Sequence, residues 1–116
     1  AKKQKEQNAQ SISLINQQLQ RLIVHTPYSF VKEHEVLEKA LQKANRHVAQ
    51  STILRLMYRN NYEDIQVAIA TVDFLVQALP YLPEEKQQKI RHSLRGIVAD
   101  LKRIDPRSTH HLNIRL

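Results

Sequence analysis

The feature that most constrains the fold is an apolar repeat between two prolines near the C-terminus. Between Pro83 and Pro106, apolar residues recur at alternating steps of four and three, at Ile90, Leu94, Ile97, Leu101 and Ile104. This spacing places their side chains on one face of an α-helix, which turns once in about 3.6 residues. Proline suits the start of a helix and stops one that precedes it. The sequence therefore predicts an amphipathic helix over residues 83–105.

Two helices are predicted in the first half of the chain. The first carries an apolar stripe at Ile12, Ile15, Leu19 and Leu22. Pro27 ends it, because proline disfavours helical geometry in the residue before it. The second begins near Ser29, a good N-cap residue, and continues to Arg59. It is predicted to be continuous because no proline or glycine interrupts it, with residues 49–52 as the place most suited to a bend.

A third predicted helix, over residues 61–79, is the most apolar part of the chain. Val67, Ala68 and Phe74 widen its apolar face beyond a narrow stripe. We therefore expect it to lie against more than one neighbour or to form an oligomer interface. Asp73 is an acid within this segment, where we expect it to face solvent or to pair with an arginine. Polar residues interrupt the segment too often for a membrane span.

The composition agrees with an all-helical fold. The 116 residues include one glycine, four prolines and no cysteine. The lack of cysteine excludes disulfides and thiolate metal sites, and it is compatible with a reducing cytoplasm. We predict an all-α, four-helix antiparallel bundle over residues 1–106 with a long second helix, followed by a short flexible C-terminal tail over residues 107–116. The protein is expected to be soluble and cytoplasmic, without membrane contact.

The residue spacing does not point to catalysis or to a metal site. The six histidines lack the Glu-x-x-His spacing of a dinuclear metal bundle, and the pair His34 and Glu38 offers too few ligands. No serine stands in a recognisable arrangement with a histidine and a carboxylate, and there is no glycine-rich phosphate loop. The sequence therefore predicts a non-enzymatic protein without a metal, a cofactor or a small-molecule substrate.

Positive charge is concentrated towards the end of the chain. Residues 86–116 contain eight lysines and arginines against two aspartates, a local net charge of +6 within a total of +7. If the apolar stripe of the last helix faces the core, its outer side carries Lys89, His92, Arg95, Lys102 and Arg103. A basic stripe of this kind attracts nucleic-acid phosphates irrespective of base sequence.

A second cluster of basic and aromatic residues surrounds the turn between the second and third helices. It consists of Arg55, Tyr58, Arg59 and Tyr62. Bases of single-stranded nucleic acid stack on aromatic rings and guanidinium planes, so this cluster is a second candidate for nucleic-acid contact. In the competing interpretation, the basic residues form only a solvated helix surface and the tyrosines seal the helix ends.

Together these features predict a binding module that contacts nucleic acid, either RNA or DNA, as an accessory subunit of a larger complex. Association with itself or with a protein partner is also expected, and the acidic patch of Glu33, Glu35 and Glu38 offers a contact for the basic stripe of a second copy. The alternative is a protein-binding adaptor, inhibitor or immunity-type protein that acts through an apolar helix surface or the C-terminal tail.

The last helix also carries a resemblance to known proteins. Its sequence, PEEKQQKIRHSLRGIVADLKR, and the order of the predicted elements are similar to the small basic four-helix accessory proteins of diversity-generating retroelements. Helical bacteriocin-immunity proteins are similar in size, in charge and in their lack of cysteine. No residue role is transferred from either group, since no diagnostic motif is shared.

Overall fold

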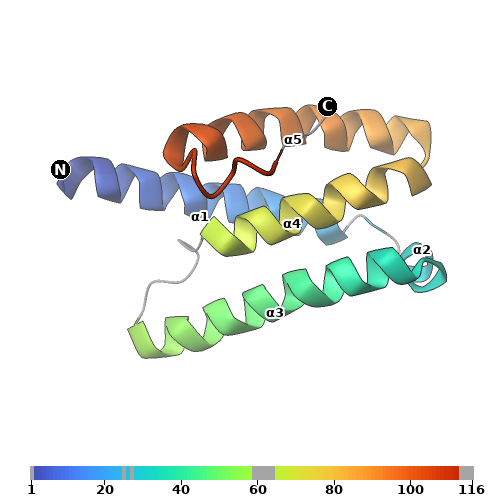
Figure 1. The fold of residues 1–116 in the computed structure, drawn as a ribbon, viewed down its shortest axis with the longest axis horizontal. Coiled ribbons are helices and arrows are strands. Elements are labelled where there is room, and N and C mark those ends of the chain that lie inside the picture. Colours follow the sequence, from blue (N-terminus) through green and yellow to red (C-terminus); the bar gives the residue numbers. More distant parts are fainter. Residues whose placement is uncertain (1, 25, 27, 59–64, 113–116) are drawn as a thin grey trace.

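The computed structural model describes residues 2–24, 26, 28–58 and 65–112, and all regular structure within them is helical, which confirms the predicted all-α class. The helices are α1 (Lys2–Val24), α2 (Tyr28–Glu33), α3 (Glu35–Tyr58), α4 (Ile65–Ala78), the short 3₁₀ turn η1 (Leu79–Tyr81) and α5 (Glu84–Ile104) (Figure 1). None of the helices in these ranges is both long enough and apolar enough to cross a bilayer.

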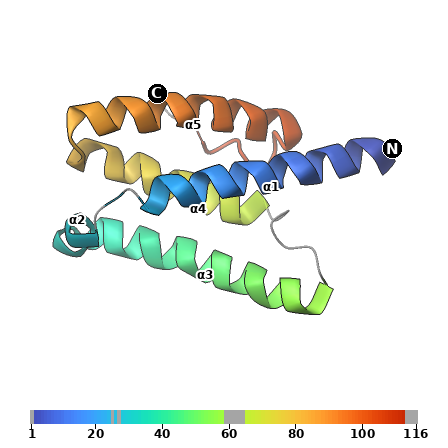
Figure 2. The ribbon, with the colours of Figure 1, turned by 180° about the vertical axis from the view of Figure 1, so that it is seen from behind.

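Helix α4 lies at the centre of the fold and packs against α1, α3 and α5. Its central position explains its wide apolar face: Ala68, Val72 and Leu75 have no exposed surface. Helices α1 and α4 run in one direction, and α3 and α5 run in the opposite direction (Figures 1 and 2). Because α1 packs against α4 in a parallel orientation, the arrangement differs from the simple antiparallel bundle that we predicted.

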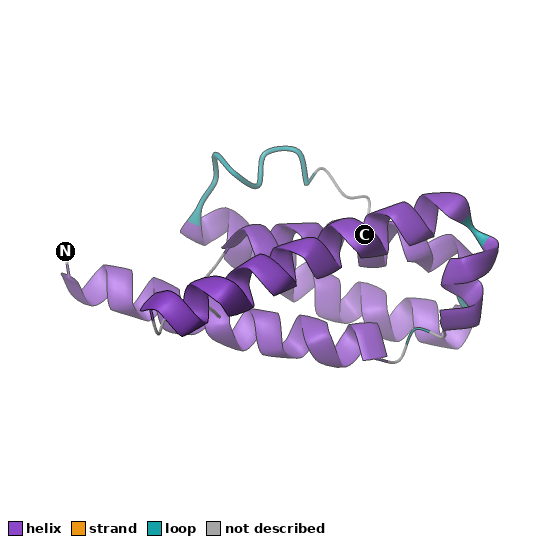
Figure 3. Cartoon of the chain, turned by 90° about the horizontal axis from the view of Figure 1, so that it is seen from below, coloured by secondary structure: helices purple, strands orange, loops and turns teal. Residues whose placement is uncertain are grey.

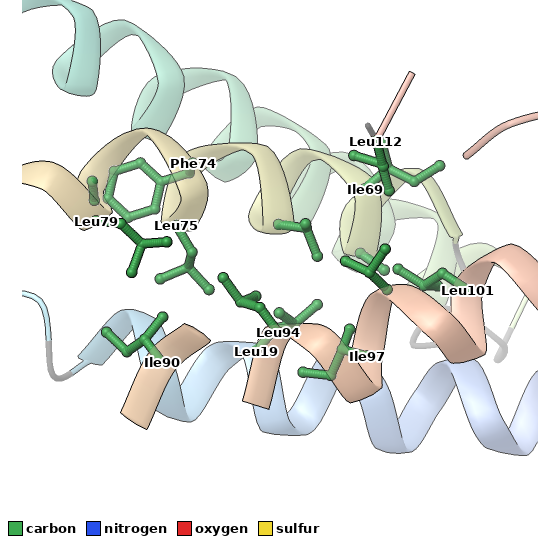
Figure 4. Close-up of a cluster of buried hydrophobic side chains, with 14 of the residues drawn as sticks. Leu19, Ile69, Phe74, Leu75, Leu79, Ile90, Leu94, Ile97, Leu101 and Leu112 are labelled. Carbon is green, nitrogen blue, oxygen red and sulfur yellow. The ribbon is translucent and has the colours of Figure 1, made fainter. Parts of the chain in front are cut away.

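Helix α5 has the register that the sequence predicts. Its core residues Ile90, Leu94, Ile97 and Leu101 are at most 4% exposed. They meet Leu19 of α1 and Leu75 of α4 in a continuous apolar cluster (Figure 4). Glu84 and Glu85 occupy the first turn and basic residues the last, so both ends complement the helix dipole. The outer side of α5 is thereby set by packing.

The predicted long second helix is wrong, because the chain breaks at His34 into α2 and α3, and the described residues contain five α-helices rather than four. The His34 N–H donates to the Val31 carbonyl at 3.2 Å, and the Glu38 N–H donates to the His34 carbonyl at 3.0 Å. Val31 and Leu37 are both 1% exposed. In one straight helix their side chains would point about 120° apart, so the break allows both to reach the core. Residues 49–52, the predicted place for a bend, are helical.

Residues 105–112 fold back onto the bundle, so the predicted flexible tail is wrong for this segment (Figure 3). Thr109 is fully buried, and Leu112 is 1% exposed and lies beside Ile69 (Figure 4). The Ser108 N–H donates to the Asp105 carboxylate at 3.1 Å, and the Thr109 hydroxyl donates to the Asp105 carbonyl at 2.7 Å. Residues 113–116 of the predicted tail lie outside the described residues.

Gly96 lies on the exposed side of α5, where an added Cβ atom would meet nothing within 4 Å. Glycine within a helix costs about 0.5–1 kcal/mol relative to alanine, so Gly96→Ala is expected to raise the free energy of unfolding by about this amount in urea titrations. The reciprocal variant, Ala99→Gly at another exposed position of α5, is expected to lower it similarly. A loss of stability in Gly96→Ala would instead place Gly96 in a contact between copies of the chain.

Candidate nucleic-acid interface

The five residues predicted to form a basic stripe are all exposed on α5. They are Lys89, His92, Arg95, Lys102 and Arg103, and we call them the basic face. They lie on the outer side of the helix because the leucines and isoleucines on its inner side are buried in the core. At 1.5 Å per residue, the basic face extends over about 21 Å.

The charge of the basic face is largely free of acidic neighbours. Among the described residues, only Arg103 of this face contacts a carboxylate, with 3.5 Å between Arg103 Nη2 and Asp100 Oδ1. Both side chains are mostly exposed, at 71% and 55%. Exposed pairs of this kind are worth about 0–1 kcal/mol, and salt weakens them further. An incoming anion can therefore compete for Arg103 and reach the other cations directly.

Two hollows adjoin the basic face, one towards each end of α5. Each has a volume of about 270 Å³. The first is lined by Leu22, Lys86, Lys89 and Ile90. The second is lined by Lys102, Pro106, Thr109 and His110. Lys86 is exposed and belongs to this surface, although the sequence analysis did not include it in the stripe. The sequence feature that could have identified Lys86 is its spacing of three residues from Lys89, because residues three apart are neighbours on a helix.

The second predicted cluster of basic and aromatic residues adds no side chain to the candidate interface. Arg55, Tyr58, Arg59 and Tyr62 lie outside the residues whose side chains the structure describes. The candidate interface therefore consists of the basic face together with Lys86.

The acidic patch lies at the end of the bundle where α5 begins (Figure 1). Glu33 and Glu35 are exposed there, and the Glu35 carboxylate lies 3.5 Å from the Lys39 ammonium group. Lys102 and Arg103 are in the last turn of α5, at the far end of the bundle. A contact between the acidic patch and this end of the basic face would therefore join two molecules.

Asp73, which we expected to face solvent or to pair with an arginine, is 34% exposed and lies beside a histidine. His111 Nε2 lies 3.7 Å from Asp73 Oδ2, which connects the folded-back segment to α4. Burial raises the pKa of Asp73 above its ordinary value, and attraction to His111 and Lys43 only partly offsets this effect. The Asp73–His111 pair therefore joins the C-terminal segment to α4.

The raised pKa of Asp73 predicts a pH-dependent stability. A carboxyl group that holds its proton more tightly when folded contributes stability below its ordinary pKa of 3.8, and this contribution is lost as pH rises through the folded value. Asp73→Asn should therefore become more stable relative to the wild type as pH rises from 3 to 6, measured by urea unfolding. Hydrogen bonds from the Ser108 side chain and backbone lower the pKa of Asp105, so the stability that Asp105 contributes is lost as pH falls. Asp105→Asn should therefore become less stable relative to the wild type as pH rises from 3 to 6. If the free energy of unfolding changed with pH in the same way in both variants, the opposite pKa shifts of Asp73 and Asp105 would be contradicted.

The side chain of His34 packs against another ring. The His34 ring lies 3.9 Å from the Tyr81 ring, centre to centre. Within the same described part, no three His, Asp or Glu side chains come together as a metal site.

Comparison with protein-family models, curated proteins and solved structures finds no match for this chain. The fold and the chemistry of the surface therefore carry the assignment of function.

Proposed function

We propose that this protein is a non-enzymatic binding module that contacts the phosphate backbone of RNA or DNA through the basic face of α5, as an accessory subunit of a larger complex. The observation that carries the proposal is the placement of five exposed basic residues on the outer side of one helix. Folding does not require cations at these positions, because uncharged polar residues would also keep the outer side of α5 soluble.

The dimensions of the basic face suit a nucleic-acid backbone. Its length of about 21 Å corresponds to about six base pairs at 3.4 Å each. Lysine and arginine contacts to phosphate position a protein without reading base sequence. The formal net charge of the chain counts lysine and arginine as positive and histidine as neutral at pH 7, so Lys89, Arg95, Lys102 and Arg103 carry the charge of the basic face. We therefore count four phosphate contacts.

The number of contacts predicts the salt dependence of binding. Each phosphate contact contributes about −0.9 to the slope of log affinity against log salt concentration on B-form DNA. Four contacts give a slope of about −3.6, which is a loss of about 150-fold in affinity between 50 and 200 mM salt. Fluorescence anisotropy with labelled DNA and RNA oligonucleotides measures this slope. Absence of binding to both at about 50 mM salt and 100 μM protein would remove the proposal, since non-specific binding falls in the range of about 10⁻⁴–10⁻⁶ M.

A second candidate function, a protein-binding adaptor or inhibitor, is favoured by apolar surface at the end of the bundle where α3 begins. Val36 is 64% exposed and Tyr81 is 44% exposed. The Tyr81 ring lies 3.9 Å from the His34 ring, centre to centre, and His34 is two residues before Val36 in the sequence. Pull-downs with and without nuclease separate the candidates. Partners lost on nuclease treatment support nucleic-acid binding, whereas partners retained by the wild type but lost by Val36→Asp with Tyr81→Asp support the adaptor.

A further inference from the structure

We infer that the hollow lined by Leu22, Lys86, Lys89 and Ile90 accepts one unpaired nucleotide. This inference rests on the proposed function and names the part of a nucleic acid that this site takes. It predicts that nucleic acids with an unpaired end bind more tightly than blunt duplexes.

The hollow lies where α1 and α5 meet. Lys86, Lys89 and Ile90 are spaced by three and four residues, so they share one side of α5. Leu22 is in the last turn of α1, which packs against α5. Ile90 is buried and Leu22 is partly buried, whereas both lysines are exposed. The hollow therefore has an apolar floor and two ammonium groups at its rim.

This combination of surfaces matches a nucleotide. A simple anion would contact the ammonium groups but leave the apolar floor of the hollow uncovered. A hydrocarbon would cover this floor but leave the two ammonium groups unpaired. The flat faces of a nucleobase fit against leucine, isoleucine and the aliphatic stems of the lysines, while its phosphate meets the ammonium groups. The volume of about 270 Å³ lies just below the range of about 300–1,000 Å³ for small-ligand pockets, which is the scale of one nucleotide.

The hollow is continuous with the basic face, because Lys89 belongs to both. A strand whose phosphates follow the basic face from Arg103 to Lys89 reaches the hollow at the start of α5. Residues 84–104 include no phenylalanine, tyrosine or tryptophan, so the ring that the basic face offers to a base is the imidazole of His92. A base therefore gains apolar contact in the hollow that α5 does not provide elsewhere.

Three oligonucleotides test the inference on the unmodified protein by fluorescence anisotropy at about 50 mM salt. They are a blunt duplex, the same duplex with two-nucleotide overhangs, and that duplex with abasic overhangs, which keep the phosphates and lack the bases. Stacking of one base on an aromatic ring changes affinity by about five- to 150-fold, and contact with leucine and isoleucine is expected at the lower end of this range. We expect the base-bearing overhangs to bind about tenfold more tightly than the abasic overhangs.

Two variants locate the effect. Lys86→Gln is expected to reduce the gain from base-bearing overhangs, measured as the ratio of its affinities for base-bearing and abasic overhangs. Lys32→Gln, an exposed lysine on α2, is the matched control and should retain the full gain. Leu22→Gln makes the floor of the hollow polar, and it should abolish the difference in affinity between base-bearing and abasic overhangs. If Leu22→Gln fails to fold, the comparison of overhangs on the unmodified protein still decides.

Each result has a distinct meaning. Equal affinity for base-bearing and abasic overhangs would overturn the inference and leave the proposed function intact. A base-dependent gain that persists in both Lys86→Gln and Leu22→Gln would also overturn it, because the base would bind elsewhere. Displacement of an overhang by a fatty acid or an acidic peptide, but not by a mononucleotide, would assign the hollow to another ligand. Failure to bind all three oligonucleotides and RNA would overturn the proposed function itself.

Discussion

Replacing the four charged residues of the basic face with glutamine is expected to reduce nucleic-acid affinity by about three and a half orders of magnitude at 0.1 M salt. The variant carries Lys89→Gln, Arg95→Gln, Lys102→Gln and Arg103→Gln, all at exposed positions. Each lost phosphate contact removes about 0.9 from the salt slope, which is about eightfold in affinity at 0.1 M salt. Anisotropy titrations over a salt series should therefore give a slope of about −3.6 for the wild type and close to zero for the variant.

The matched control removes the same charge from other surfaces. Lys3→Gln, Arg21→Gln, Lys32→Gln and Arg46→Gln together change two lysines and two arginines at exposed positions of α1, α2 and α3. This variant should lose less than about tenfold in affinity, since long-range attraction between exposed charges is screened beyond about 10 Å at 0.1 M salt. Both variants should keep the helical circular dichroism of the wild type. Equal losses in the two variants would show that binding follows net charge rather than the basic face.

The basic face could be predicted from the sequence because it depends on a local pattern. In α5 the apolar spacing alone determines which side enters the core, and the complete burial of Leu94 and Leu101 confirms that side. The exposed positions of Lys89 and Arg95 then follow from helix geometry. The hollow beside Lys86 could not be predicted in the same way. It requires Leu22 from α1, and the packing of α1 against α5 is a tertiary contact that no local pattern specifies.

The break at His34 depends on tertiary contacts and could not be predicted. No proline or glycine marks it, so the sequence pattern favours a continuous helix. The break is stabilised instead by simultaneous burial of Val31 and Leu37 and by packing of the His34 ring on Tyr81. For the C-terminal segment, the sequence predicted a short flexible tail over residues 107–116. It did not show that Leu112 would find a site beside Ile69, which is far away in the sequence.

Leu112→Ala is expected to lower the free energy of unfolding by about 2–5 kcal/mol, a large effect for a residue outside every helix. Its side chain is 1% exposed and belongs to the same apolar cluster as Ile69 and Leu101. Truncation removes this contact and leaves a cavity that the surrounding helices fill only in part. At roughly 4 °C per kcal/mol for a domain of this size, the expected fall in Tm is about 8–20 °C, measurable by thermal circular dichroism.

Leu14→Ala is the control, because it removes the same atoms from a leucine that is 60% exposed on α1. Its effect should stay within about 0.5 kcal/mol. Equally small effects in both variants would mean that the C-terminal segment is not docked in solution. A selective loss in Leu112→Ala also bears on the adaptor hypothesis, since a partner that binds Leu112 must first undock the segment. Such a partner loses about tenfold in affinity for each 1.4 kcal/mol that undocking costs, whereas the exposed basic face carries no such cost, which favours the basic face over the tail as the binding surface.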